Sequence, residues 1–166
     1  ASINRSLVEV DLLLAGLQAA LATRAFADLE AAAGDDRLAL AGLARQSLLV
    51  RDIALVDLRG RVLAAVQPAT REVGFALSSD FLASLSEAGA QVAMSLSAPT
   101  LNFSTGEHSL HFARVVTFVD GQRAALVAEV QVSALQRELS PALALPGVVT
   151  LLERDHGQVL AVVPAD

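Results

Sequence analysis

The sequence predicts an α+β fold: a PAS-like, antiparallel five-stranded sheet with a long N-terminal helix and further flanking helices. Three observations support this prediction. Apolar residues recur in steps of four and three up to Leu21, which is a helical period. From Leu48 the period becomes that of strands. Two later apolar segments are joined by Asp120-Gly121, a strong hairpin signal.

The N-terminal helix carries its apolar residues on one heptad seam, and we expect it to continue to about Gly34 and to be followed by a shorter helix through Arg45. Two interpretations of the seam stay open: the helix lies on its own domain, or it pairs with its twin in a homodimer. Residues 1–47 are therefore predicted to form stalk or dimerisation helices. The seam consists of Ile3, Leu7, Val10, Leu14, Leu17 and Leu21.

Residues 48–140 are predicted to form the main α+β lobe. It begins with a hairpin at Ile53–Val66 that turns at Arg59-Gly60, followed by a loop at Pro68–Gly74. The further predicted elements are a helix capped by Ser78 or Ser79 and running to Gly89, strands at Val92–Ser97, Ser109–Val119 and Ala124–Val132, and a helix from Ser133.

The segment Val149–Val163 nearly repeats the phrase of the first hairpin. We therefore expect a second hairpin within residues 141–166. It either starts a second, truncated lobe or adds to the sheet of the first.

Composition excludes several classes of function. The net charge is -6, which argues against nucleic acid and anionic membrane surfaces as partners. The chain has no Lys, Cys or Tyr, so a Schiff base, a thiolate nucleophile and a phenolic acid are all excluded. The sequence has no uninterrupted run of about 18 apolar residues, so we expect no membrane-spanning segment within these 166 residues.

Several phrases resemble those of Cache or PDC domains, which are PAS-like extracytoplasmic sensor domains of bacterial transmembrane receptors. The resemblance covers most of the chain from Ala1 to Leu139, and VVTLLERDHGQVLAVVP looks like the opening of a second lobe in the double-Cache type. The best-matching phrases are LVDLRGRVLAAV, APTLNFSTGEHSLHFARVV and VDGQRAALVAEVQVSAL.

The resemblance implies a periplasmic ligand sensor of an inner-membrane protein, anchored by flanking membrane segments. Its N-terminal helix would serve as stalk and homodimer contact. Its output would be a diguanylate cyclase, histidine kinase or chemotaxis domain. The domain itself would have no enzymatic activity and no cofactor. The absence of Tyr and Trp departs from the amino-acid-binding branch of the family.

Arg114 is the first candidate for a ligand contact. On a strand it shares a face with Phe112, Val116 and other apolar side chains, and a guanidinium buried there needs an anionic partner. That partner is either a ligand carboxylate or an Asp or Glu of the protein itself. Arg71, Ser97 and Asn102 are further candidates around a site for a small polar or anionic ligand. We expect this site between the sheet, the loop Gln67–Phe75 and the helix Ser79–Ala88.

Glu129 completes the candidate set, because it matches an acidic position that some family members use to hold a ligand amine. The alternation of residues along this strand, taken by itself, favours an outward, solvated side chain for Glu129. His108 and His111 are spaced three apart, which puts them on opposite faces of a strand, so we expect no metal site there. By the same alternation, His111 shares its sheet face with Ala113 and Val115.

Two other functions compete with ligand sensing. A dimerisation or protein-interaction domain that senses nothing predicts a pocket filled by its own side chains. A small hydrolase lacks support, because Ser104-Thr105-Gly106 is not the Gly-x-Ser-x-Gly turn that exposes a nucleophile.

Overall fold

The structure is a computed structural model of the chain. It describes residues 2–31, 42, 45–88, 94–143, 150–154 and 158–163, with side chains at 5–29, 42, 45–88 and 94–138. One antiparallel sheet has the strand order β2-β1-β6-β5-β3, and β4 also pairs with β5. Its strands are β1 (Val50–Asp57), β2 (Val62–Ala65), β3 (Ser95–Leu96), β4 (Thr100–Asn102), β5 (Glu107–Thr117) and β6 (Arg123–Gln131).

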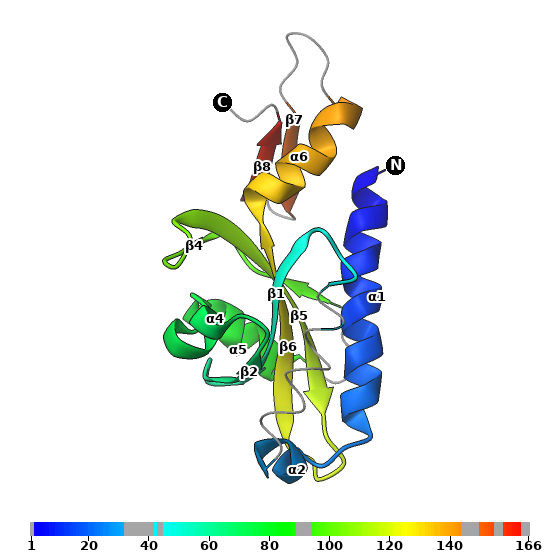
Figure 1. Ribbon diagram of the computed structural model, residues 1–166, viewed down its shortest axis with the longest axis vertical. Helices are drawn as coiled ribbons and strands as arrows, with labels where there is room; N and C mark the ends of the chain where they lie inside the picture. Colours follow the sequence, from blue (N-terminus) through cyan, green and yellow to red (C-terminus); the bar gives the residue numbers. More distant parts are fainter. Residues whose placement is uncertain are drawn as a thin grey trace.

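Helices lie on both sides of this sheet. The long helix α1 runs along one side of the strands, and the short helices α4 and α5 lie on the other (Figure 1). This arrangement confirms the predicted α+β class with a long N-terminal helix. The helices are α1 (Ser2–Ala22), α2 (Phe26–Ala31), α4 (Pro68–Val73), α5 (Ser79–Glu87) and α6 (Val132–Leu143).

Successive residues of a strand point to opposite sides of the sheet. Helices cover both sides, so the sheet buries apolar side chains on both of its faces. One core joins α1 to the face of β5 that carries Phe112 and Val116. The other joins α5 to the face of β5 that carries Ala113 and Val115. We call these the helix α1 face and the pocket face.

The apolar seam of α1 packs against its own sheet. Its side chains at Val10, Leu14, Leu17 and Leu21 are buried together with residues of β5 and β6. Of the two interpretations left open by the sequence, the structure therefore shows the helix lying on its own domain. Leu12, on the outer side of the helix, is exposed.

The N-terminal helical segment is interrupted earlier than the sequence predicts. Helix α1 ends at Ala22 and α2 begins at Phe26, whereas the seam predicts one helix to about Gly34. The cause lies far along the chain: the Asp120 carboxylate accepts the backbone N–H of Phe26 at 2.9 Å, and the Val119 N–H donates to the Arg24 carbonyl at 3.1 Å. These contacts supply a cap that starts a new helix.

The first hairpin is confirmed, with Gly60 in its turn at a φ of 94° that favours glycine. The helix capped by Ser78 is also confirmed, since the Ser78 hydroxyl accepts the Phe81 N–H at 3.1 Å. Two segments differ from expectation. Residues 68–73 form helix α4 rather than a loop, with Pro68 at its first turn. The short strand β4 was not predicted, and it brings the main sheet to six strands.

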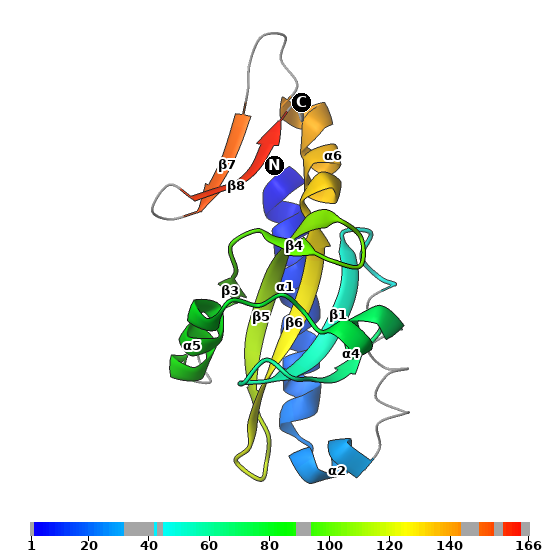
Figure 2. The same ribbon diagram turned by 90° about the vertical axis from the view of Figure 1, so that its left-hand side faces the viewer.

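The repeated phrase near the C-terminus forms the predicted hairpin, with strands β7 (Thr150–Arg154) and β8 (Gln158–Val163). It makes a two-stranded sheet of its own, so it does not add to the main sheet. Figure 2 shows this hairpin beside α6, beyond the end of the main sheet. None of the described helices combines the length and apolar character that a bilayer-spanning segment requires.

Some predictions fall outside the described residues. They are the short helix towards Arg45, the first residues of the strand predicted at Val92–Ser97, and the turn of the second hairpin. The proposed division at residues 47 and 140 stays a prediction.

Candidate functional site

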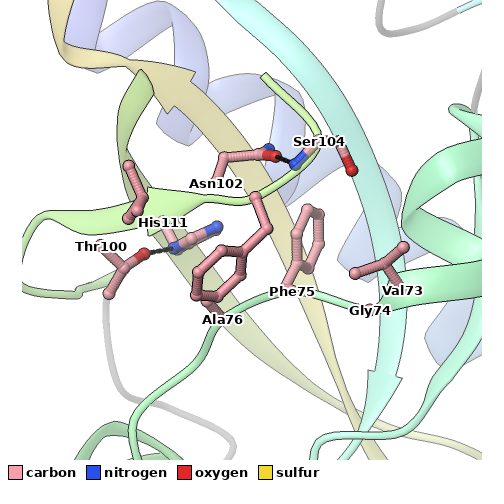
Figure 3. Close-up of a pocket in the computed structure, with 10 residues that line it drawn as sticks. Val73, Gly74, Phe75, Ala76, Thr100, Asn102, Ser104 and His111 are labelled. Atoms are coloured by element: carbon pink, nitrogen blue, oxygen red, sulfur yellow. Dashed lines mark hydrogen bonds between the residues drawn. The ribbon is translucent and has the colours of Figure 1, made fainter. Parts of the chain in front are cut away.

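A pocket of about 130 Å³ opens on the pocket face of the sheet, beside β4 and β5. Its walls come from the end of α4 with the segment after it, from β4 with its turn, and from His111 on β5 (Figure 3). The lining residues are Val73, Gly74, Phe75, Ala76, Thr100, Leu101, Asn102, Phe103, Ser104 and His111. The predicted loop at 67–75 thus contributes to the pocket, whereas helix α5 does not.

His111 forms the floor of the pocket on the strand side and is 2% exposed. Its Nδ1 lies 3.5 Å from the Thr100 hydroxyl, and its ring stacks at a tilt on Phe75 with centroids 4.9 Å apart. Burial lowers the pKa of His111 to about 4, against the raising effect of the nearby Glu129 charge. The imidazole is therefore neutral at physiological pH.

Ser97 holds the backbone of His111. Its hydroxyl accepts the His111 N–H at 2.9 Å, and its own N–H donates to the His111 carbonyl at the same distance. Ser97 is 3% exposed and directly follows β3. Ser97 does not line the pocket, and its two hydrogen bonds position His111; the ligand contact that the sequence predicted for Ser97 stays a prediction.

Glu129 is completely buried, so the prediction of an outward, solvated side chain, which the alternation along the strand favoured, is wrong. The reason is that both faces of β6 are covered. The Glu129 carboxylate accepts hydrogen bonds from Arg51 at 2.9 Å, from the Ser109 hydroxyl at 2.7 Å and from the Asn102 side-chain amide. Every one of these partners belongs to the protein, so the carboxylate is already satisfied.

Asn102 connects this buried carboxylate to the pocket. Its amide nitrogen donates to Glu129, and its amide oxygen accepts the Ser104 N–H at 2.8 Å, which shapes the turn after β4. Figure 3 shows Asn102 bonded to Ser104 at one edge of the pocket. Among the five candidates from the sequence, Asn102 is the one that lines the pocket.

A second buried carboxylate, Asp52, lies opposite Glu129 on the neighbouring strand. Burial raises the pKa of Asp52, and the Glu129 charge adds to the increase. The Thr70 hydroxyl and the Gln67 N–H donate to Asp52, which fixes the start of α4 to the sheet. The two carboxylates therefore anchor β4 and α4, the two walls of the pocket.

Arg114 lies on the helix α1 face, away from the pocket. Its guanidinium donates to Asp11 at 2.7–2.8 Å and to the Gln18 side chain at 3.1 Å. Of the two partners weighed from the sequence, the structure shows a carboxylate of the protein itself, and a ligand role for Arg114 stays a prediction. Arg71 is exposed on α4 and does not line the pocket.

Sequence reasoning missed His111, Thr100 and Phe103 as pocket residues, and it included Phe75 only as the end of the predicted loop at 67–75. The signal for His111 was present, because its alternation with Ala113 and Val115 placed it on the second sheet face. Thr100 and Phe103 lie in segments without a period, so no pattern could place them.

No protein-family model matches the chain, and no curated protein does. Solved structures do match. The ligand-binding domain of the Campylobacter jejuni chemoreceptor Tlp3, in complex with 4-methylisoleucine, is 13% identical with a TM-score of 0.72. The match covers 98% of this chain and 64% of that one, so the chain spans slightly less than two thirds of the Tlp3 domain.

Two further matches come from other receptors. The sensor domain of the V. cholerae histidine kinase DctB is 15% identical, with a TM-score of 0.62, over 96% of this chain and 62% of that one. The ligand-binding domain of the Pseudomonas aeruginosa amino acid chemoreceptor PctC, in complex with GABA, is 18% identical, with a TM-score of 0.62, over 96% of this chain and 69% of that one. The chain therefore has the PAS-like fold of the sensory domains of chemoreceptors and histidine kinases.

Proposed function

We propose that the chain is an extracytoplasmic ligand-sensing domain of a membrane-anchored signalling receptor. The observation that carries this proposal is the open pocket on the pocket face, supported by two buried carboxylates that hold its walls. A pocket lined by aromatic side chains with a few polar groups is the usual form of a small-molecule site. The shared fold with chemoreceptor and kinase sensor domains supports the same function.

The alternative, a domain that senses nothing, predicts a pocket filled by the protein's own side chains. About 130 Å³ of open space beside His111 argues against it. Cavities of this order hold a molecule the size of benzene.

The remaining parts of the proposal concern the full receptor. Membrane segments and a diguanylate cyclase, histidine kinase or chemotaxis output would lie in other parts of the protein. A homodimer through the N-terminal helix would have to use its outer side, where Val8 and Leu12 are exposed, because the inner seam is buried in the sheet.

A thermal-shift screen of small metabolites tests the proposal with two matched variants. Ala76→Phe fills the pocket, and Ala83→Phe adds the same side chain on the exposed side of α5, outside the pocket. A ligand at 100 times its Kd stabilises by about 2.7 kcal/mol. For a chain of this length the corresponding rise in Tm is about 5–10 °C.

We expect at least one compound to raise the Tm of the wild type and of Ala83→Phe while leaving Ala76→Phe unchanged. Compounds that act equally on both variants would place binding outside the pocket and contradict the proposal.

A further inference from the structure

The lining of the pocket carries no formal charge. Its ten residues are apolar, amide, hydroxyl or glycine residues together with one histidine, His111, which is neutral because its pKa is lowered to about 4. A charged ligand entering such a site loses its hydration without gaining an opposite charge, which costs several kcal/mol.

The two buried carboxylates that anchor the walls of the pocket are already paired inside the protein. Glu129 accepts three hydrogen bonds, one of them from Arg51. Asp52 accepts from Thr70 and Gln67. Within the described part of the chain, neither carboxylate keeps an oxygen that lines the pocket.

His111 does have a polar atom to offer. Its Nδ1 lies beside Thr100, and Figure 3 shows the other nitrogen, Nε2, on the far side of the ring, facing the side of the pocket where Phe75 lies. No described residue forms a hydrogen bond with this Nε2, although the side chain is 2% exposed. A buried polar atom without a partner is rare in native proteins and calls for an explanation, which a ligand would supply.

The apolar surfaces of the pocket limit the shape of this ligand. The ring of Phe75 lies against His111, and Phe103 lines the rim with 77% of its surface exposed. The volume of about 130 Å³ is close to that of cavities that bind benzene. The site thus fits a compact, flat body with one polar group.

We infer that the pocket binds a small uncharged molecule, with an apolar or aromatic body between Phe75 and Phe103 and one hydrogen-bonding group on Nε2 of His111. This inference rests on the proposed function and names its ligand class. A carboxamide is a suitable probe, because it both donates and accepts and so pairs with either tautomer of His111.

Binding of benzamide, benzoate and benzylamine tests the inference, because the three share a ring and differ in charge. Backbone amide shifts of Phe75, Leu101 and Phe103 in NMR titrations report occupation of the pocket. We expect benzamide to bind at least tenfold more tightly than either charged probe. A tenfold difference in Kd corresponds to about 1.4 kcal/mol, and burying an unpaired charge costs more than that.

Two variants of one residue test the contact. His111→Asn keeps a polar group near Thr100 and removes the Nε2 position, whereas His111→Gln keeps an amide near that position. We expect His111→Asn to weaken benzamide binding about fivefold, the value of one neutral hydrogen bond, and His111→Gln to change it by less than about twofold. Equal effects of the two variants would overturn the assigned contact.

The outcomes separate the inference from the function on which it rests. Benzoate or benzylamine binding at these amides as tightly as benzamide would overturn the uncharged ligand class and leave a ligand-binding domain. If none of the three probes shifts these amides, the inferred ligand class fails, whereas the proposed function is decided separately by the metabolite screen on the Ala76→Phe and Ala83→Phe variants.

Discussion

Glu129→Gln perturbs the buried contact that holds the pocket wall. The substitution keeps the shape of the side chain but replaces one carboxylate oxygen by an amide group that only donates. Whichever way the amide is oriented, either Arg51 or the pair Asn102 and Ser109 loses its acceptor. Breaking a buried ion pair costs about 3–5 kcal/mol. Because the Arg51 side chain is 22% exposed and keeps some hydration, we expect the lower end, about 3 kcal/mol.

Urea unfolding followed by far-UV circular dichroism measures this loss in the free energy of unfolding. Fluorescence is unsuitable because the chain has no Trp or Tyr. Glu107→Gln is the matched control: Glu107 lies exposed on β5, so its substitution should change stability by less than about 0.5 kcal/mol. A cost below about 1 kcal/mol for Glu129→Gln would refute the view that this carboxylate fixes β4 to the sheet.

Three further predictions follow from burial and charge. Because the pKa of His111 in the fold, about 4, lies below its ordinary 6.5, its neutral form stabilises the fold above pH 6.5, and this contribution is lost as the pH falls through 4. His111→Gln should therefore lose about 3 kcal/mol less stability than the wild type between pH 7 and pH 4 in urea unfolding, and equal losses would contradict the shift. Leu14→Ala should cost about 2–5 kcal/mol, because Leu14 is fully buried, while Leu12→Ala on the outer side of α1 should cost less than about 0.5 kcal/mol; similar values would show that α1 does not pack on the sheet. Arg114→Ala should leave the benzamide-induced amide shifts of Phe75, Leu101 and Phe103 in place, since Arg114 lies on the helix α1 face and does not line the pocket; disappearance of these shifts in an NMR titration would restore Arg114 to the site.

Patterns with a period predicted the fold well, because they depend on neighbours along the chain. Alternation placed Arg114 with Phe112 on one face of β5 and His111 with Ala113 on the other, as the structure shows. The Asp120-Gly121 turn and the two hairpins were equally local signals, and the strands they join are paired as predicted.

Contacts between distant segments could not be predicted in this way. The break before α2 depends on Asp120, which is 94 residues from Phe26. The burial of Glu129 depends on cover supplied by other elements, whereas alternation along β6 only separates its two faces. Strand β4 has three residues, too few to show a period, and yet it provides one wall of the pocket.

Strand β5 is the element that joins the pocket to helix α1. On one face it carries His111 beneath the pocket, and three residues later Arg114 bonds to Asp11 of α1 on the opposite face. The Gln18 side chain adds a second link, since its amide nitrogen donates to the Val115 carbonyl at 2.7 Å. A ligand moves α1 only if it binds one arrangement of β5 more tightly than another, because equal affinity shifts no equilibrium. In a receptor that signals through α1, a signal from the pocket would have to pass through these hydrogen bonds and through the apolar packing of α1 on β5.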